Sequence, residues 1–178
     1  MIRSITILLS ILLFATPCYS ADTNWAADAG STNTGSTDGS VETFGTPALM
    51  FDENDATYYG SSEFEAGAVT TVGNSLFACT HAINRIRVIF GTYYPSSAGN
   101  TYKVEAYYSA GWNTVDSGNV SATTQTLDLT GLTLTGVSQV KVTIVDNGFE
   151  TGFGWSSICL IYEISAWGTD PAGYVIIY

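Results

Sequence analysis

Apolar and polar residues alternate with a period of two along most of the chain, which is the pattern of half-buried β-strands. In the segment "INRIRVIF", Ile86, Val88 and Phe90 share one face, and Arg85 and Arg87 share the other. The same alternation runs through 101–108, where the apolar face holds Tyr102, Val104, Ala106 and Tyr108, and through 140–145, where it holds Val140, Val142 and Ile144. No amphipathic helix of any length appears, so the pattern predicts an all-β domain.

Turn residues divide these strands at short intervals, as in a β-sandwich or jelly roll. The segment "LDLTGLTL" predicts a short hairpin-like pair around Gly131. Residues 21–47 are rich in Gly, Ser, Thr, Asn and Asp and show no helical period. We expect this part to be an irregular lead-in with at most one edge strand.

Residues 1–20 resemble a secretory signal peptide rather than part of the fold. Arg3 precedes a short apolar run, Pro17 follows it, and small residues stand before a predicted cleavage at Ala21. The alternative is a lipid anchor on Cys18. Either outcome places the protein outside the cell, secreted or on the extracellular surface.

The remaining chain is predicted to form one domain, residues 21–169, followed by a tail. No later stretch approaches the roughly 20 apolar residues of a transmembrane helix. The tail, 170–178 with the sequence "DPAGYVIIY", has two predicted roles. It is either an extra edge strand folded back on the domain or a segment that pairs with a partner.

The net charge of the chain makes some classes of binding partner unfavourable. Without the signal segment the chain keeps four Lys and Arg residues against sixteen Asp and Glu, a net charge of −12. This field disfavours nucleic acid and anionic membranes, because each phosphate contact would oppose it. A cation or a neutral ligand fits the charge better.

Two cysteines, Cys79 and Cys159, remain in the predicted domain. In an exported chain an even pair favours a disulfide, which here closes a loop of about 80 residues and contributes about 4 kcal/mol. Strand alternation puts Cys159, Ile161 and Glu163 on one face of "CLIYEISAW". The alternative is a pair of buried free thiols.

The segment "FDENDATYY" holds the strongest candidate for metal chemistry. Asp52, Asn54, Asp55 and Thr57 place four oxygen donors within six residues, which suits a hard cation such as calcium. The segment is not an EF-hand, because Thr57 stands where that motif needs glycine. The remaining alternative is a solvated acidic turn.

Four segments in order resemble one known family. "FDENDATYY" is similar to its "DGNxxTxW" stretch, "INRIRVIFG" to the strand that follows, "TYKVEAYYSAGWNTVDSGN" to its strand and hairpin, and "IYEISAWG" to its closing strand. Over about residues 24–168 the chain therefore resembles discoidin-like domains, which include the type C domains of coagulation factors and the galactose-binding-like carbohydrate modules. Glu53 stands where the family usually has Gly, and Tyr59 where it has Trp.

The resemblance implies a galactose-binding-domain-like jelly roll of about eight mostly antiparallel strands with a structural calcium ion. The implied ligands are the carboxylates of Asp52 and Glu163, the carbonyl of Asn54, the hydroxyl and carbonyl of Thr57, and the backbone oxygens of Leu49 and Tyr162. Such a site would tie an early loop to the last strand, so its implied role is stability.

The resemblance also implies that loops at one end of the sandwich bind the ligand. Sugars stack their C–H faces on aromatic rings and pair their hydroxyls with carboxylates and amides. The predicted contacts are Asn147, Phe149, Glu150, Phe153 and Trp155 in one loop and Tyr93, Tyr94 and Asn100 in another. The alternative is that some of these rings cap the core. The second loop lacks the Arg that galactose-binding members carry, so galactose specificity is not implied.

These observations predict a secreted, non-catalytic binding module that recognises a glycan or another cell-surface ligand. The alternative is a structural or adhesive surface protein that contacts protein partners through exposed aromatics and the tail. An enzyme is not predicted: the chain has one histidine, His81, and the carboxylates of Asp146 and Glu150 are the one candidate pair.

Overall fold

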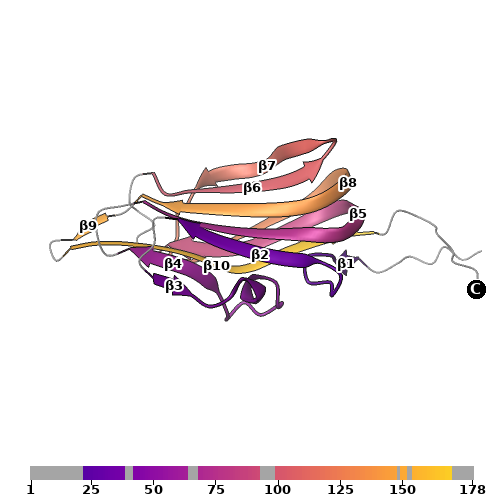
Figure 1. The fold of residues 1–178 in the computed structure, drawn as a ribbon. Coiled ribbons are helices and arrows are strands. Elements are labelled where there is room, and N and C mark those ends of the chain that lie inside the picture. Colours follow the sequence, from indigo (N-terminus) through magenta and orange to yellow (C-terminus); the bar gives the residue numbers. More distant parts are fainter. Residues whose placement is uncertain are drawn as a thin grey trace, which may run out of the picture.

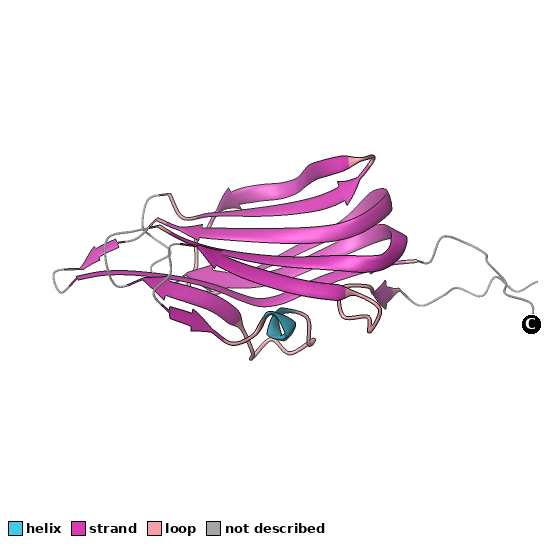
Figure 2. Ribbon diagram, in the orientation of Figure 1, coloured by secondary structure: helices cyan, strands magenta, loops and turns pink. Residues whose placement is uncertain are grey.

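A computed structural model describes residues 22–38, 42–63, 68–92, 99–147, 149–151 and 154–169; for 63, 149–151 and 154–156 it describes the backbone alone. Within these residues the chain is almost entirely strand, with one short 3-10 helix (Figure 2). The elements are β1 Thr23–Asn24, β2 Thr32–Asp38, β3 Glu42–Phe44, η1 Pro47–Met50, β4 Tyr59–Glu63, β5 Val69–Thr92, β6 Thr101–Tyr108, β7 Gly111–Asn119, β8 Gln125–Asp146, β9 Phe149–Thr151 and β10 Gly154–Gly168.

Two long strands, β5 and β8, connect the two layers of the fold. Their neighbours follow the order β3-β4-β10-β5-β8-β6-β7, with β2 beside β5, and the pairings are antiparallel. The first part of β5 lies between β2 and the second part of β8, whereas its second part lies between β10 and the first part of β8. Both strands therefore bend from one layer into the other (Figure 1). The predicted jelly-roll sandwich is confirmed, with ten strands in the described residues.

The bend coincides with breaks in the β5–β8 ladder. The register of the ladder shifts between Leu76 and His81, between His81 and Ile83, and between Ile83 and Arg85. On β8, Gly131 and Gly136 have φ values of +71° and +70°, which residues with a side chain rarely adopt. The hairpin predicted around Gly131 is therefore wrong: these glycines curve one continuous strand instead of reversing it.

The core confirms the predicted alternation. Its fully buried side chains come from both layers and include Ile86, Val88, Phe90, Val104, Ala106, Val140, Val142, Ile144, Ile161 and Ile164. A Cβ at Gly73 of β5 would lie 2.5 Å from Ile164 Cδ1 of β10 and 2.8 Å from Met50 Sδ of η1. The two layers thus pack face to face, with η1 closing the core at one side.

The N-terminal lead-in is more ordered than its composition predicts. It contains β1, β2 and β3, and β2 pairs with β5 along seven residues. Its side chains alternate between half-buried and exposed, which polar residues on an edge strand tolerate. The expectation of at most one strand is wrong because small polar residues do not prevent pairing when a neighbouring strand offers a full ladder.

The predicted disulfide is also wrong. Cys79 and Cys159 are both free. Cys159 is buried opposite Thr92, and its Sγ donates to the Val69 carbonyl at 3.2 Å. Cys79 is exposed in the bend of β5 at the other end of the sandwich, beside His81 Nε2 at 3.4 Å. A disulfide needs Cα atoms within about 7 Å, which this arrangement does not allow.

Two predicted segments, 1–20 and 170–178, lie outside the described residues. Among the residues that are described, no helix has the length and apolar character needed to cross a membrane.

Candidate functional site

The acidic segment after η1 folds into a tight loop built by its own side chains. Asp52 Oδ1 accepts from the Asn54 amide at 3.0 Å, and Asn54 Oδ1 accepts from the Ala56 amide at 3.1 Å. Glu53 has a φ of +58°, in the left-handed region that favours glycine. This explains why the family has Gly at that position. Here Asn24 Nδ2 donates to Glu53 Oε1 at 2.9 Å, which holds the strained residue against β1.

The hydroxyl group of Thr57 lies close to several oxygen atoms of this loop. Its Oγ1 lies 2.8 and 3.0 Å from the two Asp52 carboxylate oxygens, 2.9 Å from the Asn54 carbonyl and 3.5 Å from the Leu49 carbonyl. One hydroxyl proton can serve only one of these acceptors. The loop therefore concentrates more acceptor oxygens than it supplies donors, which is the chemistry that a hard cation satisfies.

Glu163 of β10 lies buried beneath this loop. Its Oε1 accepts from Ser165 Oγ at 2.5 Å, while Oε2 has no hydrogen-bond partner among the described residues. Burial raises the pKa of Glu163 to about 7; the Ser165 hydrogen bond opposes this rise, and the negative charges of Asp52 and Asp55 add to it. An unpartnered buried carboxylate oxygen is costly, and the Glu163 carboxylate also lies near the negative charges of the acidic loop.

A β-bulge sets this orientation. The pairing of β10 with β5 shifts between Ile161 and Glu163. Cys159 and Ile161 point into the core before the shift, and Ile164 and Ala166 do so after it. Glu163 therefore faces the outer side, under the acidic loop, instead of sharing a face with Cys159 as the alternation predicts. The structure thus brings the acidic loop and the last strand together.

The residues present fit a calcium ion. Calcium takes six to eight oxygens from carboxylates, carbonyls, hydroxyls and water. The described residues contain no cluster of three or more His, Cys, Asp or Glu side chains at metal-binding spacing. Besides Asp52 and Glu163, the protein ligands would thus be the carbonyl and hydroxyl oxygens of Leu49, Asn54 and Thr57 and the carbonyl of Tyr162, as the resemblance implies.

A second cluster joins the two loops that the sequence proposes for ligand binding. The Asn147 amide donates to Asn100 Oδ1 at 2.9 Å, and Asn147 Nδ2 donates to the Gly99 carbonyl. Asn100 also donates through Nδ2 to Thr92 Oγ1 at 3.3 Å, and its side chain is buried. Asn100 therefore links the end of β5 to Asn147 through its buried side chain, and its contact with a ligand stays a prediction. Asn147 is exposed.

The aromatic loop forms a β-hairpin. β9 pairs with the start of β10, so that Trp155 lies opposite Glu150 and Ser156 opposite Phe149. This hairpin lies at the end of the sandwich opposite the bend of β5 and β8 (Figure 1). Tyr93, Tyr94 and Phe153 lie outside the described residues, as do the side chains of Phe149, Glu150 and Trp155. Their role in ligand binding stays a prediction.

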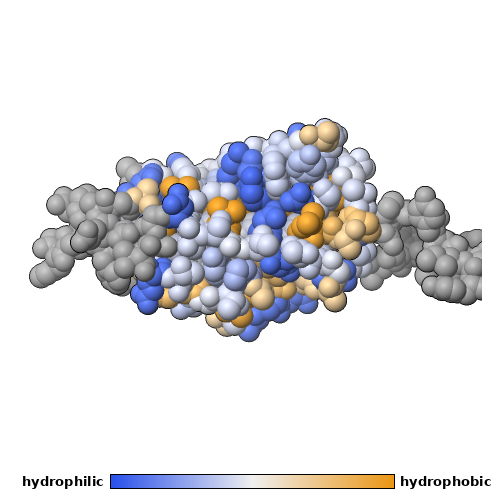
Figure 3. All heavy atoms as spheres, viewed as in Figure 1, coloured by the Kyte–Doolittle hydropathy of each residue, from blue (hydrophilic) through white to orange (hydrophobic). Residues whose placement is uncertain are grey.

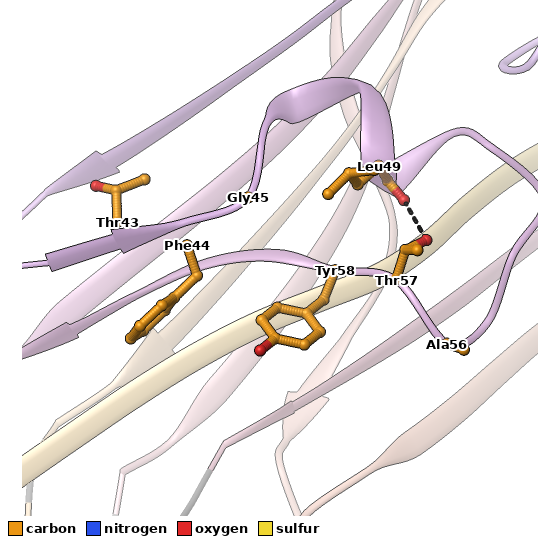
Figure 4. Close-up of a pocket in the computed structure, with 7 residues that line it drawn as sticks. All are labelled: Thr43, Phe44, Gly45, Leu49, Ala56, Thr57 and Tyr58. Atoms are coloured by element: carbon orange, nitrogen blue, oxygen red, sulfur yellow. Dashed lines mark hydrogen bonds between the residues drawn. The ribbon is translucent and has the colours of Figure 1, made fainter.

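A groove of about 460 Å³ lies beside the acidic loop. The tyrosines of "FDENDATYY" are the one sequence feature that could have indicated it. Figure 4 shows that it is formed by two segments, one from β3 to η1 and one leading into β4. It is lined by Thr43, Phe44, Gly45, Leu49, Ala56, Thr57 and Tyr58.

These features define a class of structure: a galactose-binding-domain-like β-sandwich with an acidic loop fastened over its last strand. No protein-family model matches the sequence, and neither does any curated protein. Solved structures do match. A family 32 carbohydrate-binding module from Clostridium perfringens, in complex with GlcNAc-α-1,4-galactose, shares 14% identity with a TM-score of 0.53, over 84% of this chain and 96% of its own.

Two other solved structures give the same result. The C-terminal domain of a chitobiase from Bacteroides fragilis shares 14% identity with a TM-score of 0.53, over 84% of this chain and 99% of its own. A chitosan-binding module from a Paenibacillus chitosanase/glucanase shares 19% identity with a TM-score of 0.51, over 82% of this chain and 99% of its own. The chain has the fold of family 32 carbohydrate-binding modules.

Proposed function

We propose that the protein is a secreted, non-catalytic module that binds a glycan through the loops at one end of its sandwich. The observation that carries this proposal is the hydrogen bonding of Asn147 to Asn100 and Gly99, which joins one end of each segment that the sequence proposes for ligand binding. The shared fold supports it, since the structurally similar modules include ones solved with or named for a bound sugar.

A rigid support makes such loops effective. Asn100 and Asp146, which adjoin these two segments in the sequence, are buried, and Asp146 Oδ2 accepts from the Ile158 amide of β10 at 3.2 Å. A binding surface that is ordered before the ligand arrives loses less conformational entropy on binding. The buried polar residues thus supply the preorganisation that weak sugar contacts need.

We further propose a structural calcium ion between the acidic loop and β10. Asp52, Asn54, Thr57, Leu49 and Tyr162 would supply oxygens, together with Glu163. A bound ion would satisfy the unpartnered Glu163 Oε2 and the crowded acceptors around Thr57. Its contribution would be to fix the loop on the strand.

Affinity electrophoresis in polysaccharide gels tests the binding proposal. We expect the protein to be retarded in at least one neutral polysaccharide, and Trp155→Ala to reduce that retardation at least tenfold because the hairpin loses its largest ring. Trp112→Ala is the control, since this tryptophan is 39% exposed on β7, outside both loops.

Two results of the same experiment would contradict the proposed glycan site. If no glycan retards the protein, and it instead assembles in a concentration-dependent way that deletion of 170–178 abolishes, the adhesive alternative is correct. If Trp112→Ala weakens retardation as much as Trp155→Ala does, the binding surface lies away from the hairpin.

A further inference from the structure

The groove beside the acidic loop is separate from the loop end of the sandwich. Tyr58 contacts Tyr162 of β10 edge to face, with ring centroids 5.6 Å apart. Trp155 lies seven residues earlier on the same strand, which corresponds to about 20 Å at the usual rise of a strand. The Tyr58 end of the groove is therefore distant from the loop site, whereas its Thr43 end aligns through Ser61 with Cys159, about 13 Å along the strand from Trp155.

The chemistry of the lining suits a sugar. Tyr58 is 39% exposed, and Figure 4 shows its ring on the same side as that of Phe44. Aromatic rings of this kind offer a face to the C–H side of a pyranose, and Thr43 and the nearby backbone offer hydrogen-bonding groups for its hydroxyls. The volume of about 460 Å³ lies within the range of small-molecule sites.

The negative charge near the groove favours neutral sugars over anionic ones. All seven lining residues are uncharged, and the adjoining loop carries Asp52, Glu53 and Asp55. An anionic sugar such as a uronic acid would meet a negative field without a basic partner in the lining. A neutral pyranose meets no such penalty.

The backbone makes room for this groove. Gly45 has a φ of +71°, and a Cβ there would lie 2.3 Å from the Tyr58 carbonyl oxygen and 3.0 Å from Leu49 Cδ1. The two walls therefore approach each other closely at Gly45.

We infer that this groove is a second glycan subsite, which takes one neutral pyranose stacked on Tyr58. The inference rests on the proposed glycan-binding function but uses separate residues. Two of its walls, Leu49 and Thr57, also belong to the proposed calcium loop. Calcium would fix those walls, so binding in the groove depends on calcium.

Amide chemical shifts can follow both sites at once. The protein, saturated with calcium, is titrated with galactose, N-acetylgalactosamine, glucose, N-acetylglucosamine and mannose, and with glucuronate as the anionic comparison. The amides of Gly45, Thr57 and Tyr58 report on the groove, and those of Gly99 and Asn147 report on the loop site. We expect at least one neutral sugar, and not glucuronate, to cause saturable shifts at the groove.

Variants identify the stacking ring. Tyr58→Ala should weaken groove binding at least tenfold, whereas Tyr58→Phe, which keeps the ring, should change it less than about threefold. Trp112→Ala is the matched control, because Trp112 has the same exposed fraction of 39% on another face. Chelation of calcium should weaken groove binding severalfold.

The outcomes separate this inference from the proposed function. Shifts confined to Gly99 and Asn147 would support the loop site and overturn the second subsite. Shifts confined to the groove would support the subsite and contradict the loop site. Absence of saturable shifts at both places with all five neutral sugars would overturn both. Groove binding that survives Tyr58→Ala would also overturn the assignment.

Discussion

Two glutamates with buried side chains, Glu105 on β6 and Glu163 on β10, have opposite electrostatic surroundings. Glu105 accepts from Lys103 Nζ at 2.6 Å and from Lys141 Nζ at 2.8 Å. Burial raises the pKa of Glu105, but the two lysines outweigh it and lower this pKa overall. Glu163 faces Asp52 and Asp55, and its pKa is raised to about 7. Two lysines thus neutralise Glu105 within the fold, whereas Glu163 forms no ion pair with the described lysines and arginines.

The positions of the basic residues explain why the surroundings of the two glutamates differ. Beyond the predicted signal segment the chain has four Lys and Arg residues. Lys103 and Lys141 serve Glu105, and the two arginines pair with surface aspartates, Arg85 with Asp128 at 2.8 Å and Arg87 with Asp55 at 2.7 Å. Each of the four basic residues thus has an acidic partner other than Glu163. Glu163 can be neutralised by a proton, which its raised pKa favours, or by the calcium ion proposed above; Arg87 acts on it through longer-range attraction.

Calcium removal should give the largest effect. A ligand at one hundred times its Kd stabilises the folded state by about 2.7 kcal/mol. For a domain of this size we expect chelation to lower the unfolding midpoint by about 5 to 10 °C, as measured by calorimetry. Glu163→Gln should abolish this calcium response, because it removes a carboxylate ligand without changing the shape of the side chain.

The matched control is Glu105→Gln. This variant should lose stability in calcium and in chelator alike, because its partners are lysines of the protein. If Glu105→Gln also lost the calcium response, or if Glu163→Gln kept it, the two carboxylates would not differ in the way proposed here.

The next expected effect is a change with pH in the free energy of unfolding of the calcium-free protein. The pKa of Glu163 is raised from 4.5 to about 7, so between these values the folded state holds a proton that the unfolded state has lost. The free energy of unfolding should therefore fall as pH rises from about 4.5 to about 7, by about 3 kcal/mol from this group. Above and below that window its contribution is constant.

Urea unfolding in chelator at pH 5 and pH 8 measures this change. Glu163→Gln should remove the fall and should be more stable than the natural sequence at pH 8. An unchanged pH profile in Glu163→Gln would assign the dependence to another group.

Much of the fold could be predicted from the sequence, because alternation decides which side chains face the core. Ile86, Val88 and Phe90 are buried as expected, and so are Val104 and Ala106. One cause of the misses is local irregularity. The φ values of Gly131 and Gly136 curve a strand where a hairpin is predicted.

The same cause limits the prediction of the site. The resemblance placed Glu163 beside the acidic loop, but simple alternation put it with Cys159 on one face, because a bulge has no clear mark in one sequence. The groove at Gly45 depends on two segments that meet only in three dimensions. Asn100 could be assigned to the right loop, whereas its buried hydrogen bonds depend on Thr92 and Asn147.

The last prediction concerns Glu105, which pairs with two lysines, and its expected effect is the smallest. Lys141 is mostly buried and also lies over the Trp112 ring, with Nζ 4.1 Å from its centroid. Lys141→Met should lower the free energy of unfolding by about 1 kcal/mol at pH 7, because Glu105 loses a charged hydrogen bond. The loss should be equal in calcium and in chelator.

Lys103→Met is the comparison, since the Lys103 side chain is 47% exposed and solvent screens its pairing more strongly. The pKa of Glu105 is lowered, so its contribution is present above the unfolded pKa and disappears as pH falls through the folded value. The cost of Lys141→Met should thus shrink in acid, whereas the Glu163 effect grows as pH rises. A cost that depends on calcium would show that the two glutamates are not electrostatically independent. A cost that does not exceed that of Lys103→Met would contradict the stronger screening of the Lys103 pair.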